Sequence, residues 1–250
     1  YTVRSLTHES HMREPVTLDI DARAVEKQGY DHSMLKEMHE IPSIIEDTTR
    51  GRLKPGGVTV KLGGLDEVKR ELADMKRLSI VGCGSAYYAG LYGKYLIEDV
   101  VGIPVDMVLG SDARYANPIL SSNDVLLAVS QSGETADTLA SIKSAKERGV
   151  LTLGLINVVG STIARTVDAG VYTHAGPEIG VASTKAYVAQ LISFGLIALW
   201  LGKERGADPV RLSRLATSLQ TAPRLVESVL ARADDIRRVA EKYAHHRHML

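Results

Sequence analysis

Hydroxyl and amide side chains gather in one short segment, SQSGET, at residues 130–135. It follows an apolar run, residues 124–129, that is typical of a strand buried on both faces, and it precedes a segment with the apolar spacing of a helix. The N–H groups at a helix start carry a partial positive charge, and together with serine and threonine hydroxyls they can bind a phosphate without a lysine. An ordinary capping turn is the alternative, but four neutral hydrogen-bonding side chains in six residues exceed what one cap requires. The residues predicted to bind an anion are Ser130, Gln131, Ser132 and Thr135.

A second turn of small residues, CGSA at residues 83–86, follows another apolar strand candidate. Gly84 allows a ligand to approach the backbone closely, and Ser85 can donate a hydrogen bond to it, although small residues also suit close packing of a helix on a strand. Cys83 could act as a nucleophile only if a base activated it, and no histidine lies near it in the sequence. We therefore interpret Cys83 as a small buried hydrophobic residue and keep Ser85 as a candidate binding residue.

A third candidate segment, GPEIGVASTK at residues 176–185, contains two glycines and two hydroxyl side chains ahead of a very apolar stretch. Glu178 and Lys185 carry groups that could transfer protons. A capping box or a surface ion pair accounts for the same residue types. Glu178 is retained as the catalytic candidate, and the structural explanation stays open beside it.

Metal and nucleotide motifs are not found in the sequence. His245, His246 and His248 lie close together, but their spacing differs from the H-E-x-x-H pattern, so a solvated chain terminus is the favoured interpretation. No G-x-x-x-x-G-K-[ST] loop occurs, and no G-x-G-x-x-G segment follows a strand candidate. We expect neither a metal ion nor a cofactor.

The candidate segments require a regular fold that positions them. From about residue 65, apolar runs of strand length alternate with segments of helical spacing, which predicts a parallel sheet with helices on both faces. In such a sheet the strand-to-helix loops meet at the carboxyl edge, where ligands bind. The predicted strands are residues 77–82, 105–109, 124–129, 151–156 and 170–173.

The most apolar stretch, residues 186–201, is predicted to be a core helix. Its 16 residues include Gln190, Ser193 and Gly195, so it is short and polar for a membrane span. A helix that is apolar on most sides suits a protein interior.

Helices are also expected outside the alternating region. Asp31 could cap a helix that Pro42 would interrupt, and two amphipathic helices divided at Pro223 are expected near the end of the sequence. The apolar face of the first helix would be formed by Met34, Leu35, Met38 and Ile41.

The sequence divides into three parts by these patterns. Residues 1–50 are predicted to form an N-terminal arm and helix, in which the alternating segments TVRSL and VTLDIDA could be short strands. Residues 51–205 are predicted to form the α/β domain, and residues 206–250 a C-terminal helical linker.

Composition limits the classes of function. Lys and Arg together number 30 and Asp and Glu also 30 among 250 residues, which argues against broad attraction to nucleic acid or to an anionic membrane. The single cysteine excludes an intramolecular disulfide and is consistent with a reducing cytoplasm. The polar, mixed-charge N-terminal segment lacks the basic-then-apolar order of a signal peptide. We therefore expect a cytoplasmic protein.

Five segments carry a resemblance to a known family: GYDHSMLKE, VGCGSAYYAG, VSQSGETADT, NVVGSTIAR and AGPEIGVASTKAY. In this order and spacing, over about residues 27–200, they resemble the first sugar-isomerase (SIS) domain in the isomerase region of the glucosamine-6-phosphate synthases, also called glutamine–fructose-6-phosphate aminotransferases. The resemblance implies a flavodoxin-like three-layer α/β/α sandwich with a five-stranded parallel sheet.

The family converts fructose 6-phosphate and glutamine to glucosamine 6-phosphate and glutamate. The resemblance implies that the SQSGET segment holds the phosphate of a hexose 6-phosphate, with Val181 beside the sugar through its backbone. It also implies a serine where this chain has Ala86, so Ser85 is a candidate substitute. Ser33 and Ile41 replace the usual Phe and Gln, a difference that bears on packing.

The resemblance also implies which parts of the enzyme this sequence lacks. The family's glutaminase domain carries an N-terminal cysteine nucleophile, and its second SIS domain supplies a carboxylate base, a histidine and a lysine. We therefore expect this chain to bind the sugar phosphate and to be inactive alone, and to form a homodimer through its SIS domain. The alternatives are a self-sufficient sugar-phosphate isomerase, with Glu178 or a partner subunit's residue as base, and a non-catalytic sugar-phosphate sensor.

Overall fold

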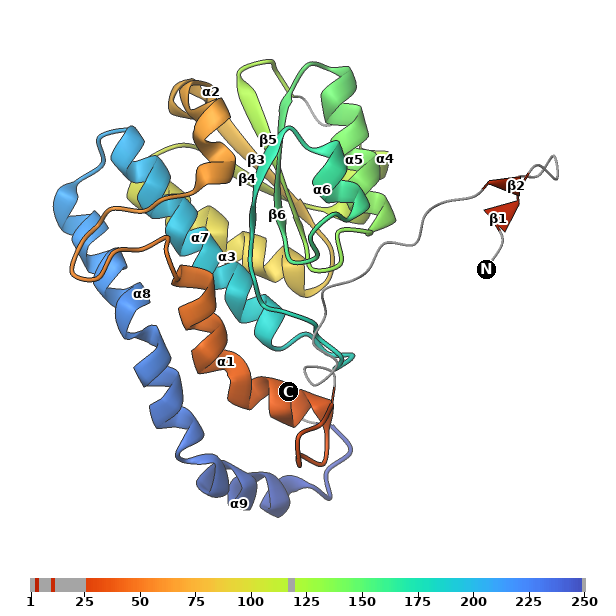
Figure 1. The fold of residues 1–250 in the computed structure, drawn as a ribbon, viewed down its shortest axis with the longest axis vertical. Helices are drawn as coiled ribbons and strands as arrows, with labels where there is room; N and C mark the ends of the chain where they lie inside the picture. Colours follow the sequence, from red (N-terminus) through yellow and green to blue (C-terminus); the bar gives the residue numbers. More distant parts are fainter. Residues whose placement is uncertain (1–2, 5–9, 12–25, 117–119, 249–250) are drawn as a thin grey trace.

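Five parallel strands form the central sheet in the order β4-β3-β5-β6-β7. Figure 1 shows the sheet together with the helices around it. The computed structural model describes residues 3–4, 10–11, 26–116 and 120–248. This strand order is that of flavodoxin-like folds, and it confirms the predicted fold class. The strands are β3 (Arg77–Gly82), β4 (Val105–Leu109), β5 (Asp124–Ser130), β6 (Leu151–Ile156) and β7 (Ala169–Tyr172).

Helices connect and flank these strands. A separate pair of two-residue antiparallel strands, β1 (Val3–Arg4) and β2 (Ser10–His11), lies in the segment predicted to be an arm, whereas the VTLDIDA strand candidate lies outside the described residues. The helices are α1 (Ser33–Thr49), the 3₁₀ helix η2 (Gly63–Val68), α2 (Lys69–Asp74), α3 (Ser85–Val101), α4 (Gly110–Tyr115), α5 (Ala136–Glu147), α6 (Thr162–Thr166), α7 (Lys185–Glu204), α8 (Pro209–Leu230) and α9 (Ala233–Tyr243).

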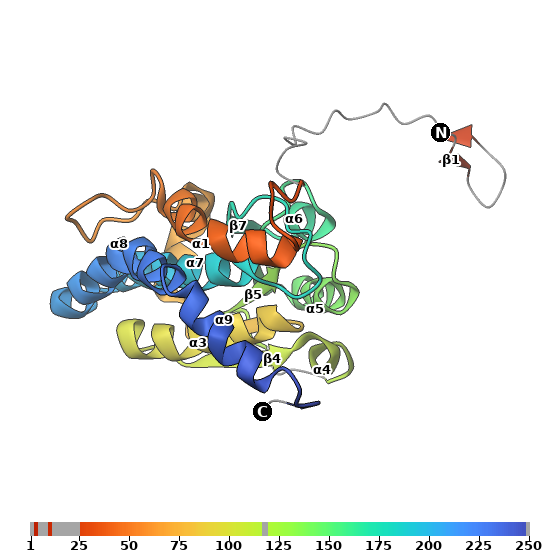
Figure 2. The ribbon, with the colours of Figure 1, turned by 90° about the horizontal axis from the view of Figure 1, so that it is seen from below.

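The side chains of β5 alternate between two hydrophobic cores. Val125, Leu127 and Val129 belong to the core that includes α3 and α7, while Leu126 and Ala128 belong to the core formed with α4, α5 and α6. Successive residues of a strand point to opposite faces, so a strand apolar throughout is covered on both. Figure 2 shows the helices on the two sides of the sheet, with α1 and α8 packed outside α7. The result is a three-layer α/β/α sandwich.

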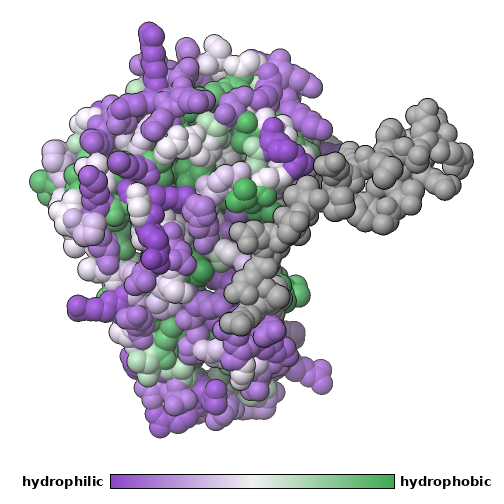
Figure 3. Space-filling model, viewed as in Figure 1, coloured by the Kyte–Doolittle hydropathy of each residue, from purple (hydrophilic) through white to green (hydrophobic). Residues whose placement is uncertain are grey.

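Helix α7 lies inside the molecule. It is long and apolar enough to cross a membrane by composition, but 83% of its most apolar window is buried against other parts of the chain. Phe194 packs on Gly93 of α3, and Gly195 faces Leu219 of α8. The prediction of a core helix is therefore confirmed. On the face drawn in Figure 3, hydrophilic side chains predominate and hydrophobic ones are scattered.

Two prolines do not interrupt the helices that contain them. Helix α1 continues through Pro42, and α8 continues through Pro223, so both predicted breaks are wrong. A proline inside a helix removes one backbone hydrogen bond, and packing beyond it offsets that loss in α1. There Ile44 and Ile45 are buried, and the Thr48 hydroxyl donates a 2.8 Å hydrogen bond to the Thr173 carbonyl.

The start and the buried face of α1 also differ from expectation. The N-cap residue is His32, without a side-chain capping hydrogen bond, so the prediction that Asp31 caps the helix is wrong. Met34 is exposed, whereas Lys36 and Glu37 are buried. The apolar pattern missed this face because part of it is charged and finds its partners in a distant segment.

Candidate functional site

The sheet changes winding direction between β3 and β5. The connection through α3 leads from β3 to β4 on one side, and the connection through α5 leads from β5 to β6 on the other. Gly82 pairs with Val129 in the register of the two strands, so the loops that follow them start next to each other and diverge. Such a switch point leaves a crevice at the carboxyl edge, the usual ligand site of this architecture. The SQSGET and CGSA segments are the two loops that diverge at this switch point.

The loop after β5 is closed by its own side chains. The buried Ser130 Oγ accepts a 2.9 Å hydrogen bond from the Gly133 N–H and lies 3.1 Å from Thr135 Oγ1. The Ser132 hydroxyl accepts a 3.2 Å hydrogen bond from the Glu134 N–H. Gly133 has φ +66°, in the left-handed region that favours glycine. The predicted hydroxyl side chains are therefore brought together in one tight turn.

The segment after β6 braces this loop from behind. The Ile163 N–H donates to the Gly133 carbonyl at 2.9 Å, and the Thr162 N–H donates to Glu134 Oε1 at 2.8 Å. The hydrogen bonds from Thr162 hold the pKa of the Glu134 carboxyl below its ordinary value. Ser161 is buried against Gly133, where a Cβ would collide with its hydroxyl. These hydrogen bonds and this close contact hold the loop in its shape.

Helix α5 begins directly at this loop. Thr135 is its N-cap residue but makes no side-chain capping hydrogen bond, because its hydroxyl lies beside Ser130 instead. A helix start that its cap does not satisfy presents backbone N–H groups and a partial positive charge. Asp137 in the first turn is paired with Arg114 at 2.8 Å, which balances its negative charge. This end of α5 has the geometry of an anion site.

The loop after β3 presents a single hydroxyl side chain. Gly84, at φ +57°, is the N-cap residue of α3, and the helix starts at Ser85, which is exposed, while Ala86 is buried. Ser85 is therefore the accessible hydroxyl of this turn. Cys83 is half-buried rather than fully buried as expected, and it packs against Gly110 with its Sγ 3.8 Å from Thr138 Oγ1.

The third candidate segment forms the loop between β7 and α7. Val181 is fully exposed at its tip. Glu178 Oε1 accepts hydrogen bonds from the N–H groups of Thr184, at 2.9 Å, and Ala186, at 3.0 Å. These are the cap and the second residue of α7, so the carboxylate caps the helix. This geometry gives Glu178 the structural role that the sequence left open beside proton transfer.

Two further side chains shape this loop and were not singled out from the sequence. Asn157, directly after β6, accepts hydrogen bonds from the Thr173 hydroxyl and the Ala175 N–H and donates one to the Gly176 carbonyl. Glu37 of α1 accepts hydrogen bonds from the opposite side of the loop. Asn157 could have been found from the sequence because it directly follows an apolar strand. Glu37 could have been found because it lies next to positions of the helix that packing would bury.

The histidines near the C-terminus, His245, His246 and His248, are exposed to solvent. His245 and His246 follow α9, where their rings are 4.0 Å apart. Across residues 26–116 and 120–248, no group of three or more His, Cys, Asp or Glu side chains is arranged to hold a metal ion.

Comparison with known proteins places this architecture in a family. A family model described as the SIS domain matches residues 71–200. A glutamine–fructose-6-phosphate aminotransferase (isomerizing) from Chlorobaculum tepidum is 43% identical over 242 residues, which make up 97% of this chain and 39% of that protein. One from Thermus thermophilus is 45% identical over 232 residues, 92% of this chain and 38% of that protein. The resemblance seen in the sequence is confirmed, and this chain spans about two fifths of those relatives.

Solved structures agree. The C-terminal domain of glucosamine-fructose-6-phosphate aminotransferase from Francisella tularensis superimposes with a TM-score of 0.83 at 31% identity, covering 88% of this chain and 62% of that one. Glucosamine-6-phosphate deaminase from Thermotoga maritima, at 21% identity and a TM-score of 0.54, covers 75% of this chain and 53% of that one and shares the fold alone. Because the SIS domain model matches more than half of this chain and the order of its strands agrees, this chain belongs to the SIS domain family.

Proposed function

We propose that this chain is the sugar-phosphate-binding part of a glutamine–fructose-6-phosphate aminotransferase and that it binds a hexose 6-phosphate at the switch point. The observation that carries the proposal is the loop of residues 130–135, which combines a hydroxyl pair with the uncapped start of α5. The relatives that match over more than nine tenths of this chain carry that name. Their activity as whole proteins, which makes glucosamine 6-phosphate from fructose 6-phosphate and glutamine, is part of the proposal.

In this proposal the phosphate is bound by neutral groups. Ser130 and Thr135 donate hydroxyl hydrogen bonds to it, Gln131 and Ser132 line the turn, and the first N–H groups of α5 point at it. Hydrogen bonds to an ionised group are about twice as strong as those between neutral groups. The zero net charge of the chain is consistent with this arrangement, because no excess of lysine is needed.

The sugar end of the ligand is assigned to the two other loops. Ser85, exposed at the start of α3, would donate to a sugar hydroxyl in place of the serine absent at Ala86. The backbone of Val181, exposed at the tip of the loop before α7, would contact the sugar from the other side.

We assign binding rather than turnover to this chain on its own. Aldose–ketose conversion needs a base next to the carbonyl carbon, and Glu178 instead caps α7. We further propose that the protein is cytoplasmic and pairs as a homodimer through this domain. The exposed tyrosines along α3, namely Tyr88, Tyr92 and Tyr95, support pairing because an exposed aromatic stripe favours burial against a partner.

Calorimetric titration tests this function. Fructose 6-phosphate and glucosamine 6-phosphate should bind the unmodified chain, and Ser130→Ala and Thr135→Ala should each weaken binding about tenfold or more, as expected for loss of a hydrogen bond to a charged group. Ser228→Ala, on the exposed surface of α8, is the matched control and should bind normally. Equal binding by the unmodified chain and both loop variants would refute the assigned loop.

A further inference from the structure

Charged side chains from α1 and α7 are buried beside the loop that precedes α7. Glu37 is 2% exposed, Lys36 3% and Lys185 4%. Burying a charge costs free energy unless it is paired and hydrogen-bonded. The polar contacts of these three side chains therefore indicate which segment of the chain they hold in position.

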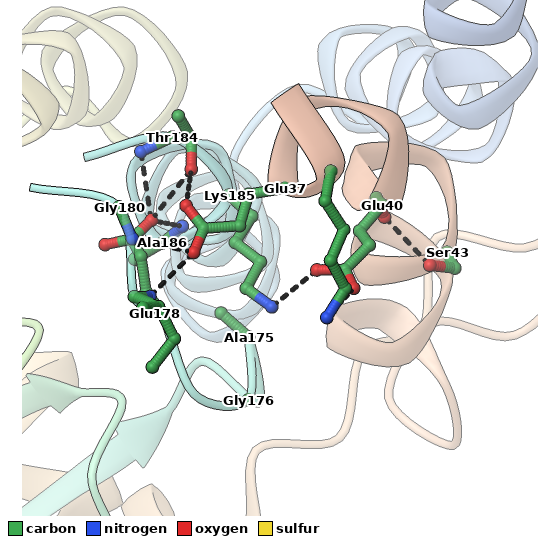
Figure 4. A network of polar contacts seen from close by, with 12 residues as sticks. Glu37, Glu40, Ser43, Ala175, Gly176, Glu178, Gly180, Thr184, Lys185 and Ala186 are labelled. Atoms are coloured by element: carbon green, nitrogen blue, oxygen red, sulfur yellow. Dashed lines mark hydrogen bonds and ion pairs between the residues drawn. The ribbon is translucent and has the colours of Figure 1, made fainter. Parts of the chain in front are cut away.

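Glu37 binds the loop backbone directly. Its Oε1 accepts hydrogen bonds from the N–H groups of Ile179, at 2.6 Å, and Gly180, at 2.9 Å, and its Oε2 accepts one from the Thr184 hydroxyl at 2.8 Å. Figure 4 shows this carboxylate reaching from α1 to the loop. Two consecutive N–H groups on one carboxylate oxygen fix the direction of the backbone, in this case just before Val181.

Lys185 completes the cluster on the other side. Its ammonium group lies 2.6 Å from Glu40, which also pairs with Lys36 at 3.3 Å. Burial alone would raise the pKa of Glu37, but the hydrogen bonds from Gly180, Ile179 and Thr184 and the charge of Lys185 outweigh it and place the pKa below the ordinary 4.5. Glu37 is therefore ionised at neutral pH and holds the loop as a carboxylate.

The two ends of the proposed site are thus held by different parts of the molecule. The loop of residues 130–135 is braced by residues 158–163 and by its own side chains. The loop around Val181 is held by α1 through Glu37 and by the Glu178 cap. Substitution of Glu37 should consequently weaken binding of the sugar without changing binding of the phosphate.

We propose that Glu37 is a positioning residue that fixes the backbone around Val181 for recognition of the sugar, independently of phosphate binding. The inference rests on the proposed function, since it assigns Val181 to the sugar end of that site. Glu37 would thus be a determinant of specificity for the sugar, although it lies on α1, 144 positions before Val181 in the sequence.

Glu37→Gln keeps the size of the side chain and removes its charge. We expect this variant to bind fructose 6-phosphate about tenfold more weakly, while inorganic phosphate, titrated by ³¹P NMR, binds as in the unmodified chain. The amides of Ile179 and Gly180 should also exchange faster with deuterium. Glu40→Gln on the same helix breaks the ion pair with Lys185 without touching the loop backbone, and it should leave the ratio of the two affinities unchanged.

Thr184→Val is the second variant if Glu37→Gln does not fold, because it removes, at similar volume, the hydroxyl that lies 2.8 Å from Glu37 Oε2 and 3.2 Å from Glu178 Oε1. Thr184→Ser restores the hydroxyl and should restore the affinity for fructose 6-phosphate. An unmodified chain that does not bind fructose 6-phosphate would refute the proposed function and this inference with it. Normal fructose 6-phosphate binding by Glu37→Gln, or equal losses for fructose 6-phosphate and inorganic phosphate, would refute the inference and leave the proposed function standing.

Discussion

The side-chain oxygens of Ser130 and Thr135 lie 3.1 Å apart, although one residue ends β5 and the other is the N-cap of α5. Since Ser130 Oγ also accepts the Gly133 N–H, the loop is closed on itself and its hydroxyls converge at the start of the helix. In the proposed function a phosphate would meet hydroxyls that their own hydrogen bonds hold in place, which would lower the entropy lost on binding.

Gly133→Ala should destabilise the chain and abolish sugar-phosphate binding. Gly133 has φ +66°, and a Cβ would collide with Ser161. Gly149 has φ +71° but open space around it, so Gly149→Ala is a matched control for backbone strain alone. Urea denaturation should show a loss of about 1 kcal/mol for Gly149→Ala and more than about 2 kcal/mol for Gly133→Ala. Equal losses would contradict the tight contact with Ser161.

Arg77→Met should make the chain more sensitive to acid. Burial would raise the pKa of the Asp124 carboxyl, but hydrogen bonds from Arg77 and Ser121 and the Arg77 charge hold it below 3.8. A depressed carboxyl pKa stabilises the fold above the unfolded-state value and loses that stabilisation as the pH falls through the folded-state value. Without Arg77 the folded-state pKa rises, so acid unfolding should begin at a higher pH.

The fluorescence of Trp200, the single tryptophan and a buried one, can follow that unfolding. We expect a stability loss of about 1–3 kcal/mol near neutral pH for the buried carboxylate left without its partner. Arg50→Met, which breaks the exposed pair with Asp47, is the control and should leave the acid transition in place. If Arg77→Met unfolds in acid at the same pH as the unmodified chain, the ion pair between Arg77 and Asp124 does not determine the pH of acid unfolding.

Glu178→Ala should affect stability and not proton transfer. Loss of the hydrogen bonds to the start of α7 is expected to cost about 1–2 kcal/mol, measured by urea denaturation. A coupled isomerase assay without glutamine should show no turnover by the unmodified chain. Turnover above background that Glu178→Ala removes would instead support the self-sufficient isomerase with Glu178 as base.

Ser85→Ala should weaken hexose 6-phosphate binding about threefold to tenfold, the effect expected for one neutral hydrogen bond. Inorganic phosphate should bind this variant normally, because Ser85 is assigned to the sugar. Ser111→Ala, at the start of the neighbouring α4, serves as the control. If Ser85→Ala binds the sugar phosphate as tightly as the unmodified chain, Ser85 does not replace the serine absent at Ala86.

The strands were predictable because their signal is local. The inner strands β3 and β6 are mostly apolar because both their faces are covered, and the apolar runs predicted there coincide with the observed bounds. The predicted bounds of β4 also coincide with the observed ones, although β4 is an edge strand on which Asp106 is exposed. The prolines were misleading because a helix held by distant packing tolerates them: α1 is anchored past Pro42 through the contact of Thr48 with Thr173.

Contacts between segments far apart in the sequence were not predictable. Glu37 lies on a helix, where a charged side chain usually faces solvent, and its partners Ile179 and Gly180 lie more than 140 residues away. The packing of Ser161 on Gly133 depends on the order of β5 and β6 in the sheet. Residue types therefore pointed to the loop that we propose binds phosphate, while the contacts that support this loop from behind required the structure.

A crystal structure of the chain with glucosamine 6-phosphate bound tests the assignment of residues 130–135 to the phosphate most directly. We expect the phosphate within hydrogen-bonding distance of the Ser130 and Thr135 hydroxyls and of the first N–H groups of α5. A phosphate bound elsewhere on the chain, with residues 130–135 contacting no part of the ligand, would contradict this assignment.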